Sequence, residues 1–148
     1  MKKIGEYTTR GSVQTDNSVN RISLDDGSFK TGYRVVEFVV APNTIGTTSG
    51  QVYTAKLMTD DAAVGINWNW DNNEEIAWSI FAFDANAISM PNMFSQVDPD
   101  NLVIQDLYLV ADEGLGTDTK MNYFIRLEKY EITDWQGALS MVRNRSQA

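Results

Sequence analysis

The sequence predicts an all-β domain, a β-sandwich or barrel, that ends in one short helix. Apolar and β-branched residues alternate in several short runs, and residues typical of turns separate the runs. The end of the chain instead repeats its apolar residues at helical spacing. Neither a linker nor an internal repeat divides the chain, so residues 1–148 are predicted to form a single domain, with the terminal helix at residues 133–147.

Three runs in the first half of the chain predict strands. Residues 20–29 predict a hairpin, because Asp26 and Gly27 form a dipeptide favoured in a two-residue type I′ turn. Residues 32–42 are rich in β-branched residues and predict a strand that ends at a proline. Residues 52–58 alternate, and one face of this strand would carry Tyr53, Ala55 and Leu57. A weaker pattern near residues 7–14 adds a further candidate strand.

The second half contains three more predicted strands around a long loop. Residues 75–83 are apolar on both faces, which predicts a central strand covered on both sides. Residues 85–101 are predicted to be a long loop, and residues 101–111 another strand. Residues 120–132 alternate, so this strand would turn four side chains inward: Met121, Tyr123, Ile125 and Leu127.

The predicted terminal helix has two interpretations. Thr133 and Gln136 have the spacing of a capping box at its start. An apolar stripe follows, and two basic residues lie near the negative end of the helix dipole. The stripe either covers the open end of the sandwich or, with the basic tail, docks onto a neighbouring subunit. The candidate partner-binding residues here are Trp135, Leu139, Val142, Arg143 and Arg145.

Residues 66–79, INWNWDNNEEIAWS, contain three of the four tryptophans. The pattern predicts a weak strand at residues 66–70, a polar turn at Asp71–Asn73 and a return strand. If residues 66–70 are extended, Trp68 and Trp70 share one face. They would then pack in the core, form a protein interface or provide a stacking platform for sugar rings. Trp78, in the return strand, is predicted to be buried.

The residue types limit the chemistry that this chain can perform. It contains no cysteine and no histidine, which excludes thiol chemistry and the commonest general base and transition-metal ligand. Asp71, Asn73 and Glu75 alternate as calcium ligands do, but the glycine and the final glutamate of an EF-hand loop are missing. The common hydrolase motifs are also absent. The sequence therefore predicts a protein that is not an enzyme and has no cofactor and no metal.

The net charge of −8 is unevenly distributed along the chain. Residues 35–119 contain one basic residue, Lys56, whereas both ends are mildly basic. This balance disfavours nucleic-acid binding, and it indicates either a solvated acidic face or complementary charge between neighbouring copies. No apolar run approaches the roughly 20 residues of a membrane helix. The opening MKKIGEYTTRG lacks the apolar stretch of a secretory signal, so assembly in a cytoplasm is expected.

Four stretches of the sequence carry a resemblance to a known class of proteins. They are GYRVVEFVVAP (32–42), DNNEEIAWS (71–79), DPDNLVIQDLYL (98–109) and MNYFIRLEKYEITDWQGALSMVRNRSQ (121–147). Together they resemble small structural proteins of marine bacteriophages. The resemblance implies a capsid-associated protein, present in many copies, with a jelly-roll-like or related β-sandwich domain. It implies no functional residues, because no site motif accompanies it.

The sequence and the resemblance together lead to one expected function and two alternatives. We expect a virion structural protein, a capsid or capsid-decorating subunit, that is assembled in the host cytoplasm. Its partners would be other copies of itself, in a homo-oligomer, or other capsid proteins, without nucleic acid or membrane. The first alternative is a carbohydrate-binding β-sandwich that uses Trp68 and Trp70. The second is a small enzyme that depends on two carboxylates from distant strands.

Overall fold

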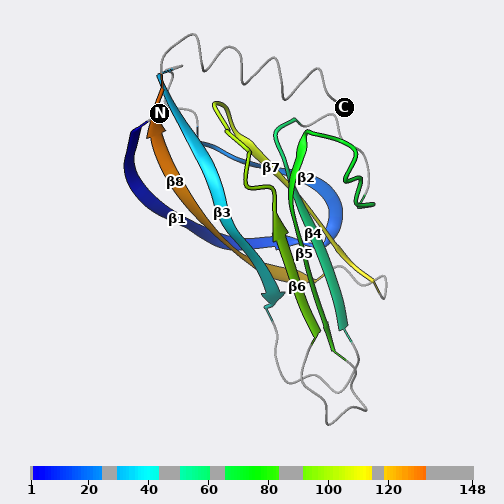
Figure 1. The fold of residues 1–148 in the computed structure, drawn as a ribbon. Coiled ribbons are helices and arrows are strands. Elements are labelled where there is room, and N and C mark those ends of the chain that lie inside the picture. The colour runs from blue at the N-terminus through cyan, green and yellow to red at the C-terminus, as the bar shows by residue number, and fades with distance from the viewer. Residues whose placement is uncertain are drawn as a thin grey trace.

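A computed structural model describes residues 2–24, 30–43, 51–60, 66–83, 92–114 and 119–132. Eight strands and no helix lie within these ranges. The strands are β1 (Lys2–Gln14), β2 (Asp16–Ile22), β3 (Thr31–Pro42), β4 (Gln51–Met58), β5 (Glu75–Phe83), β6 (Asn92–Val97), β7 (Leu107–Glu113) and β8 (Lys120–Glu131). They form two antiparallel sheets with the orders β1-β8-β3 and β2-β7-β4-β5-β6 (Figure 1). The predicted all-β class is confirmed.

The two sheets face each other in a β-sandwich-like arrangement, and their facing side chains form the main core. The three-stranded sheet contributes Val35, Phe38, Val40, Met121, Ile125 and Leu127. The five-stranded sheet contributes Ile22, Tyr53, Ala55, Leu57, Ile76, Ala77, Leu107, Leu109 and Ala111. The inward faces predicted for residues 52–58 and 120–132 are confirmed, because a strand turns every second side chain to the same face.

A β-bulge in β3 adapts its sequence to this core. The register against β8 shifts between Val35 and Glu37, which leaves Val36 as the extra residue. Val36 is therefore exposed, while Val35 and Phe38 both lie in the core. Without the bulge, a spacing of three residues would place these two side chains on opposite faces of the sheet.

The chain passes from one sheet to the other at Thr15, between β1 and β2. Thr15 is buried, and its backbone N–H donates to the Thr119 carbonyl at 2.9 Å. The Thr15 hydroxyl oxygen accepts from the Thr119 N–H at 3.0 Å. Two residues later, Asn17 adopts a positive φ of 65°, which asparagine tolerates better than most residues. The corner lets one segment form an edge strand in each of the two sheets.

Strands from opposite ends of the chain pair with each other, since β1 pairs with β8 and β2 with β7. In the middle of the chain, β4 pairs with the next strand, β5. β6 pairs with β5, and its Ser95 hydroxyl donates to the Phe38 carbonyl of β3. This bond joins the edges of the two sheets on one side of the molecule. The opposite side is formed by β1 and β2.

Three predictions about the first and middle strands are wrong in whole or in part. β2 and β3, on either side of the hairpin predicted at residues 20–29, do not pair with each other, because β2 pairs with β7 and β3 pairs with β8. The predicted turn at Asp26 and Gly27 lies outside the described residues. The long loop predicted at residues 85–101 contains β6, whose pairing with β5 was not visible in its composition. The strand predicted at residues 101–111 begins only at Leu107, because Asn101 and Val103 bind the edge of β3 instead.

Two further predictions concern residues 66–70 and the end of the chain. Residues 66–70 do not form a strand, since Lys56 and Glu75 bind their polar groups, as described below. The strand near residues 7–14 is confirmed as part of β1. The predicted terminal helix lies outside the described residues, and so do its candidate residues Trp135, Leu139, Val142, Arg143 and Arg145.

Candidate functional site

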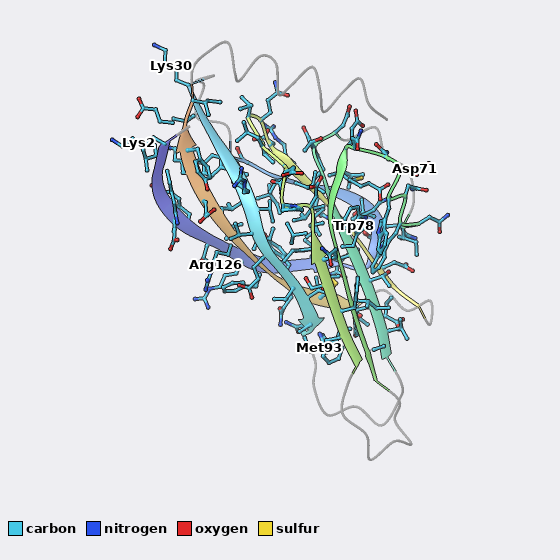
Figure 2. All side chains as sticks on the ribbon, in the orientation of Figure 1. Lys2, Lys30, Asp71, Trp78, Met93 and Arg126 are labelled. Carbon is cyan, nitrogen blue, oxygen red and sulfur yellow. The ribbon has the colours of Figure 1, made fainter. Side chains whose placement is uncertain are left out.

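Residues 66–74 lie over the outer face of the five-stranded sheet. Lys56, Trp78 and Gln96 are register neighbours on β4, β5 and β6, so their side chains share this face. The Lys56 ammonium donates to the Asn67 carbonyl at 2.7 Å, which ties the segment to β4. Trp78 is buried, as predicted. Figure 2 shows Trp78 on the strands and Asp71 beyond it at the surface.

A buried ion pair fixes this segment. The Lys56 Nζ lies 3.2 Å from Oε2 of Glu75, and both side chains are only 1% exposed. Glu75 also accepts hydrogen bonds from the Asn69 backbone at 2.8 Å, the Asn69 amide at 3.0 Å and the Trp78 indole at 3.1 Å. Burial alone would raise the pKa of Glu75, but these hydrogen bonds outweigh it and hold that pKa below its usual value. Glu75 is therefore a charged structural anchor.

The asparagines of the segment form its turn. The Asn72 N–H donates to the Asn69 carbonyl at 3.0 Å, and the Glu75 N–H donates to the Asn72 carbonyl at 3.1 Å. The Asn72 side-chain oxygen accepts from the Glu74 N–H at 3.0 Å. The polar turn predicted at residues 71–73 is thus present, and it leads directly into β5.

Trp68 and Trp70 contact different aromatic partners. The Trp70 ring is tilted by 51° over Trp78 at a centroid distance of 5.6 Å, and Trp70 is 62% exposed. The Trp68 ring stacks on Phe94 of β6 at 6.0 Å with an interplanar angle of 29°, and Trp68 is half-buried. Trp68 therefore packs against the sheet, while Trp70 offers most of its surface to solvent.

A hollow of about 370 Å³ lies beside Trp70. Its lining combines aromatic rings with polar side chains and consists of Trp70, Asn72, Asn73, Glu75, Trp78, Gln96, Val97, Asp98 and Pro99. An exposed aromatic ring next to hydrogen-bonding groups suits a ligand with one apolar and one polar face. The sequence alone missed the contribution of Gln96 and Asp98, because residues 85–101 were interpreted as a loop.

A second, wider hollow of about 610 Å³ lies against the three-stranded sheet. It is lined by Arg10, Gly11, Ser12, Val39, Val40, Ala41, Met93, Asn122, Tyr123 and Phe124. Met93 is 60% exposed, and Figure 2 shows it beside the tip of β3. No sequence pattern predicted this surface, because its residues come from four strands that pair only in the folded chain.

The edge strand β1 carries exposed apolar and charged side chains. Ile4 and Tyr7 are 47% and 52% exposed. The Lys3 ammonium lies 2.7 Å from Glu128 and also contacts Glu6, and the hydrogen bonds to Glu128 and Glu6 raise the pKa of Lys3. Two hydrogen bonds lower the pKa of Glu128, and the one from Lys3 has a larger effect than the one from Tyr130. This end of the strand is therefore held by charge–charge contacts.

The described residues contain no group of three or more acidic side chains placed to hold a metal ion. No helix long and apolar enough to span a membrane occurs in the same part of the chain. The chain matches no family model, no curated protein and no solved structure. Interpretation of its function therefore depends on the two hollows and on the edge formed by β1.

Proposed function

We propose that this chain is a structural subunit of a virion, a capsid or capsid-decorating protein with a jelly-roll-like fold. It acts by binding other copies of itself or other capsid proteins, without catalysis and without a cofactor. Assembly takes place in the host cytoplasm, and the assembled protein resides in the virion. Both the strand order and the open edge of β1 support this proposal.

The strand order supports the jelly-roll-like part of the proposal. In a jelly roll, an antiparallel ribbon that pairs the first strand with the eighth, the second with the seventh, the third with the sixth and the fourth with the fifth rolls up into two sheets. The pairs β1–β8, β2–β7 and β4–β5 follow this scheme. β6 remains paired with β5 and reaches β3 through Ser95. Jelly rolls occur in viral capsid proteins and in lectins.

The observation that carries the assembly function is the long exposed edge of β1. The strand contains 13 residues, and most of them are exposed. Exposed edges of this length are templates for pairing with another chain. A bulge between Lys3 and Gly5 interrupts only the start of β1, and the strand is regular from Gly5 to Gln14. Ile4 and Tyr7 add apolar surface at this edge, which favours a protein partner.

Light scattering on the purified chain over a wide range of concentrations tests this function. We expect a defined oligomer or growth into particles, with a mass that changes with salt because charged groups of both signs lie on the edge. A strict monomer at every concentration and salt would contradict self-assembly. Docking onto other capsid proteins would then be the only form of the proposal left to test.

The hollow beside Trp70 favours a second candidate function, carbohydrate binding. Trp70 presents a broad exposed ring whose position is held by Trp78, so a sugar ring could stack on it without reorganising the site. Titration calorimetry against a panel of oligosaccharides tests this function. Saturable binding should disappear in Trp70→Ala and persist in Met93→Ala, which removes a similarly exposed side chain at another surface. The absence of saturable binding across the panel would exclude this function for the sugars tested.

A further inference from the structure

We propose that the edge of β1 pairs with β1 of a second copy of this chain, antiparallel, about a twofold axis at Thr8. This inference rests on the proposed self-assembly and specifies its contact. Because the partner strand has the same sequence as β1, symmetry and charge determine which residues of the two copies oppose each other.

No strand of the described part of the chain lies beside the outer edge of β1. Among the described residues, β1 pairs with β8 and with no other strand. β3, at the opposite edge of the same sheet, is covered by Asn101 and Val103. β1 therefore offers backbone donors and acceptors in a row on its outer side.

Symmetry restricts the registers that two copies of β1 can adopt. In an antiparallel ladder, opposed residues have numbers with a constant sum. Along one strand, successive residues direct their backbone groups to opposite edges. Two residues that oppose each other across the axis must both direct these groups to the shared edge, so their numbers are both even or both odd. The sum must then be even, and the twofold axis passes through a residue opposed to its own copy. The surface on both copies is the same, as in any isologous dimer.

Charge selects one register. An axis at Thr8 opposes Glu6 of each copy to Arg10 of the other. The two ion pairs lie on either side of the axis and on one face of the joined sheet. An axis at Tyr7 or Thr9 opposes Glu6 to a residue with a hydroxyl group instead. The axis at Thr8 is therefore favoured by charge.

The local shape of β1 agrees with this register. A bulge between Lys3 and Gly5 interrupts the strand, so its regular part begins at Gly5. With the axis at Thr8, Gly5 of one copy faces Gly11 of the other at both ends of a central seven-residue ladder. Neither glycine carries a side chain of its own, and the place of a Cβ is taken by the Tyr7 ring at Gly5 and by the Tyr123 ring at Gly11.

A charge-reversal cycle tests the ion pairs by analytical ultracentrifugation. Glu6→Arg or Arg10→Glu alone creates two like-charge contacts across the axis, so each should raise the dimer dissociation constant at least about tenfold. The double variant Glu6→Arg, Arg10→Glu restores both contacts and should return the constant to within about threefold of the original. Lys3→Gln is the matched control, because it removes the contact between Lys3 and Glu6 within one chain and leaves the cross-axis pair intact.

Cysteine cross-linking tests the axis itself, since the chain contains no cysteine. Directly opposed residues have Cα atoms about 4.5 to 5.5 Å apart, so Thr8→Cys should form a disulfide-linked dimer on mild oxidation. Ser12→Cys is the matched control on the same exposed face. Its copy would lie eight positions away along the strand, about 26 Å, and it should not cross-link within the dimer.

The outcomes separate this inference from the proposed function. An assembly whose dissociation constant does not change with either charge reversal, or that cross-links through Ser12→Cys in preference to Thr8→Cys, overturns the register and leaves self-assembly intact. A strict monomer overturns the register and self-assembly together, and it leaves only docking onto other capsid proteins. Circular dichroism of each variant establishes that the domain remains folded, which is expected because Glu6, Thr8, Arg10 and Ser12 are all exposed.

Discussion

The two edge strands of the three-stranded sheet, β3 and β1, differ in whether other residues bind their outer backbone groups. The backbone of Tyr33 on β3 exchanges two hydrogen bonds with Val103, at 2.8 and 2.7 Å. The Asn101 side chain accepts from the Val35 N–H at 3.0 Å and donates to the Val35 carbonyl at 3.3 Å, so an amide replaces a neighbouring strand. β1 has no such cover within the described residues. The difference shows which edge the described residues cover and which edge they leave without a neighbouring strand.

The outer face of the five-stranded sheet, like the edge of β3, is covered by other residues of the chain, whereas β1 is not covered by the described residues. Residues 66–74 cover that face and bring their own hydrogen-bond partners, so Lys56 and Glu75 can be buried there as a charged pair. On β1, Lys3 contacts Glu6 while both side chains remain largely exposed. Covered regions should therefore be sensitive to substitution in the isolated chain, and β1 should be sensitive only in an assembly.

The largest expected effect comes from the core beneath the covered edge. Phe38→Ala removes a fully buried ring from β3 and should lower the free energy of unfolding by about 3–5 kcal/mol. Tyr7→Ala on the exposed edge should change it by less than about 1 kcal/mol. Urea denaturation followed by tryptophan fluorescence measures both, at a protein concentration where the chain is monomeric. Comparable losses in the two variants would show that β1 is not an open edge.

The buried ion pair should be nearly as sensitive. Glu75→Gln leaves the Lys56 ammonium buried without its counter-charge, and it should lower the free energy of unfolding by about 3 kcal/mol. Glu37→Gln is the control, because Glu37 lies 3.7 Å from Arg126 in a solvent-exposed pair that contributes about 0–1 kcal/mol. Equal effects in urea denaturation would contradict the structural role assigned to residues 66–74.

The same pair predicts how stability depends on pH. The pKa of Glu75 is lower in the folded chain than its ordinary value of 4.5, so its stabilising contribution is complete above about pH 5. It is lost as the pH falls through the lowered pKa of the folded state. The difference in urea midpoint between the original chain and Glu75→Gln should therefore shrink between pH 5 and pH 2. A difference that grows on acidification would mean that the pKa of Glu75 is raised instead.

Removing the side-chain cover of β3 should have an intermediate effect. Asn101→Ala leaves the buried N–H and carbonyl of Val35 without their partner, which costs about 1–3 kcal/mol. Gln14→Ala, at an exposed position of β1, should be neutral within about 0.5 kcal/mol. Hydrogen exchange sharpens the measurement, since the Val35 amide should lose protection in Asn101→Ala. Unchanged protection would mean that another group covers this edge.

The smallest effect is expected at the corner between the two edge strands. Asn17 has a φ of 65°, so Asn17→Ala should lower the free energy of unfolding by about 1 kcal/mol, because alanine tolerates this region poorly. Asn17→Gly should be close to neutral. Thermal denaturation of the two variants distinguishes them. A more stable Asn17→Ala variant would contradict the backbone conformation of this corner.

The sequence predicted strands best where alternation was clear and neighbouring turns were distinct. Residues 32–42, 52–58 and 120–132 were identified with nearly their observed limits. β6 was missed, because Pro91 and the Asp98-Pro99 pair dominate the composition around a strand of six residues. The turn at residues 71–73 was predicted from its polar residues. The sequence did not predict that Glu75 binds and holds this turn, because a carboxylate at the start of a strand is usually solvated.

The candidate site was predicted in part. The sequence singled out Trp68 and Trp70, but only the structure separates a packed ring on Phe94 from an exposed ring on Trp78. Their common face was expected from an extended backbone at residues 66–70, and that strand does not form. The edge of β1 could not be recognised, because exposure of an edge depends on which strands pair beside it.

The sequence by itself determined the all-β class, most strands and the side chains that face the core. These features follow from a side-chain period of two residues, which is a local property of the backbone. The tertiary structure alone decided that β1 pairs with β8, that Asn101 covers β3 and that Lys56 is buried with Glu75. Each of these contacts joins residues distant in the chain. Its free energy depends on loop closure and on neighbouring contacts that no local pattern contains.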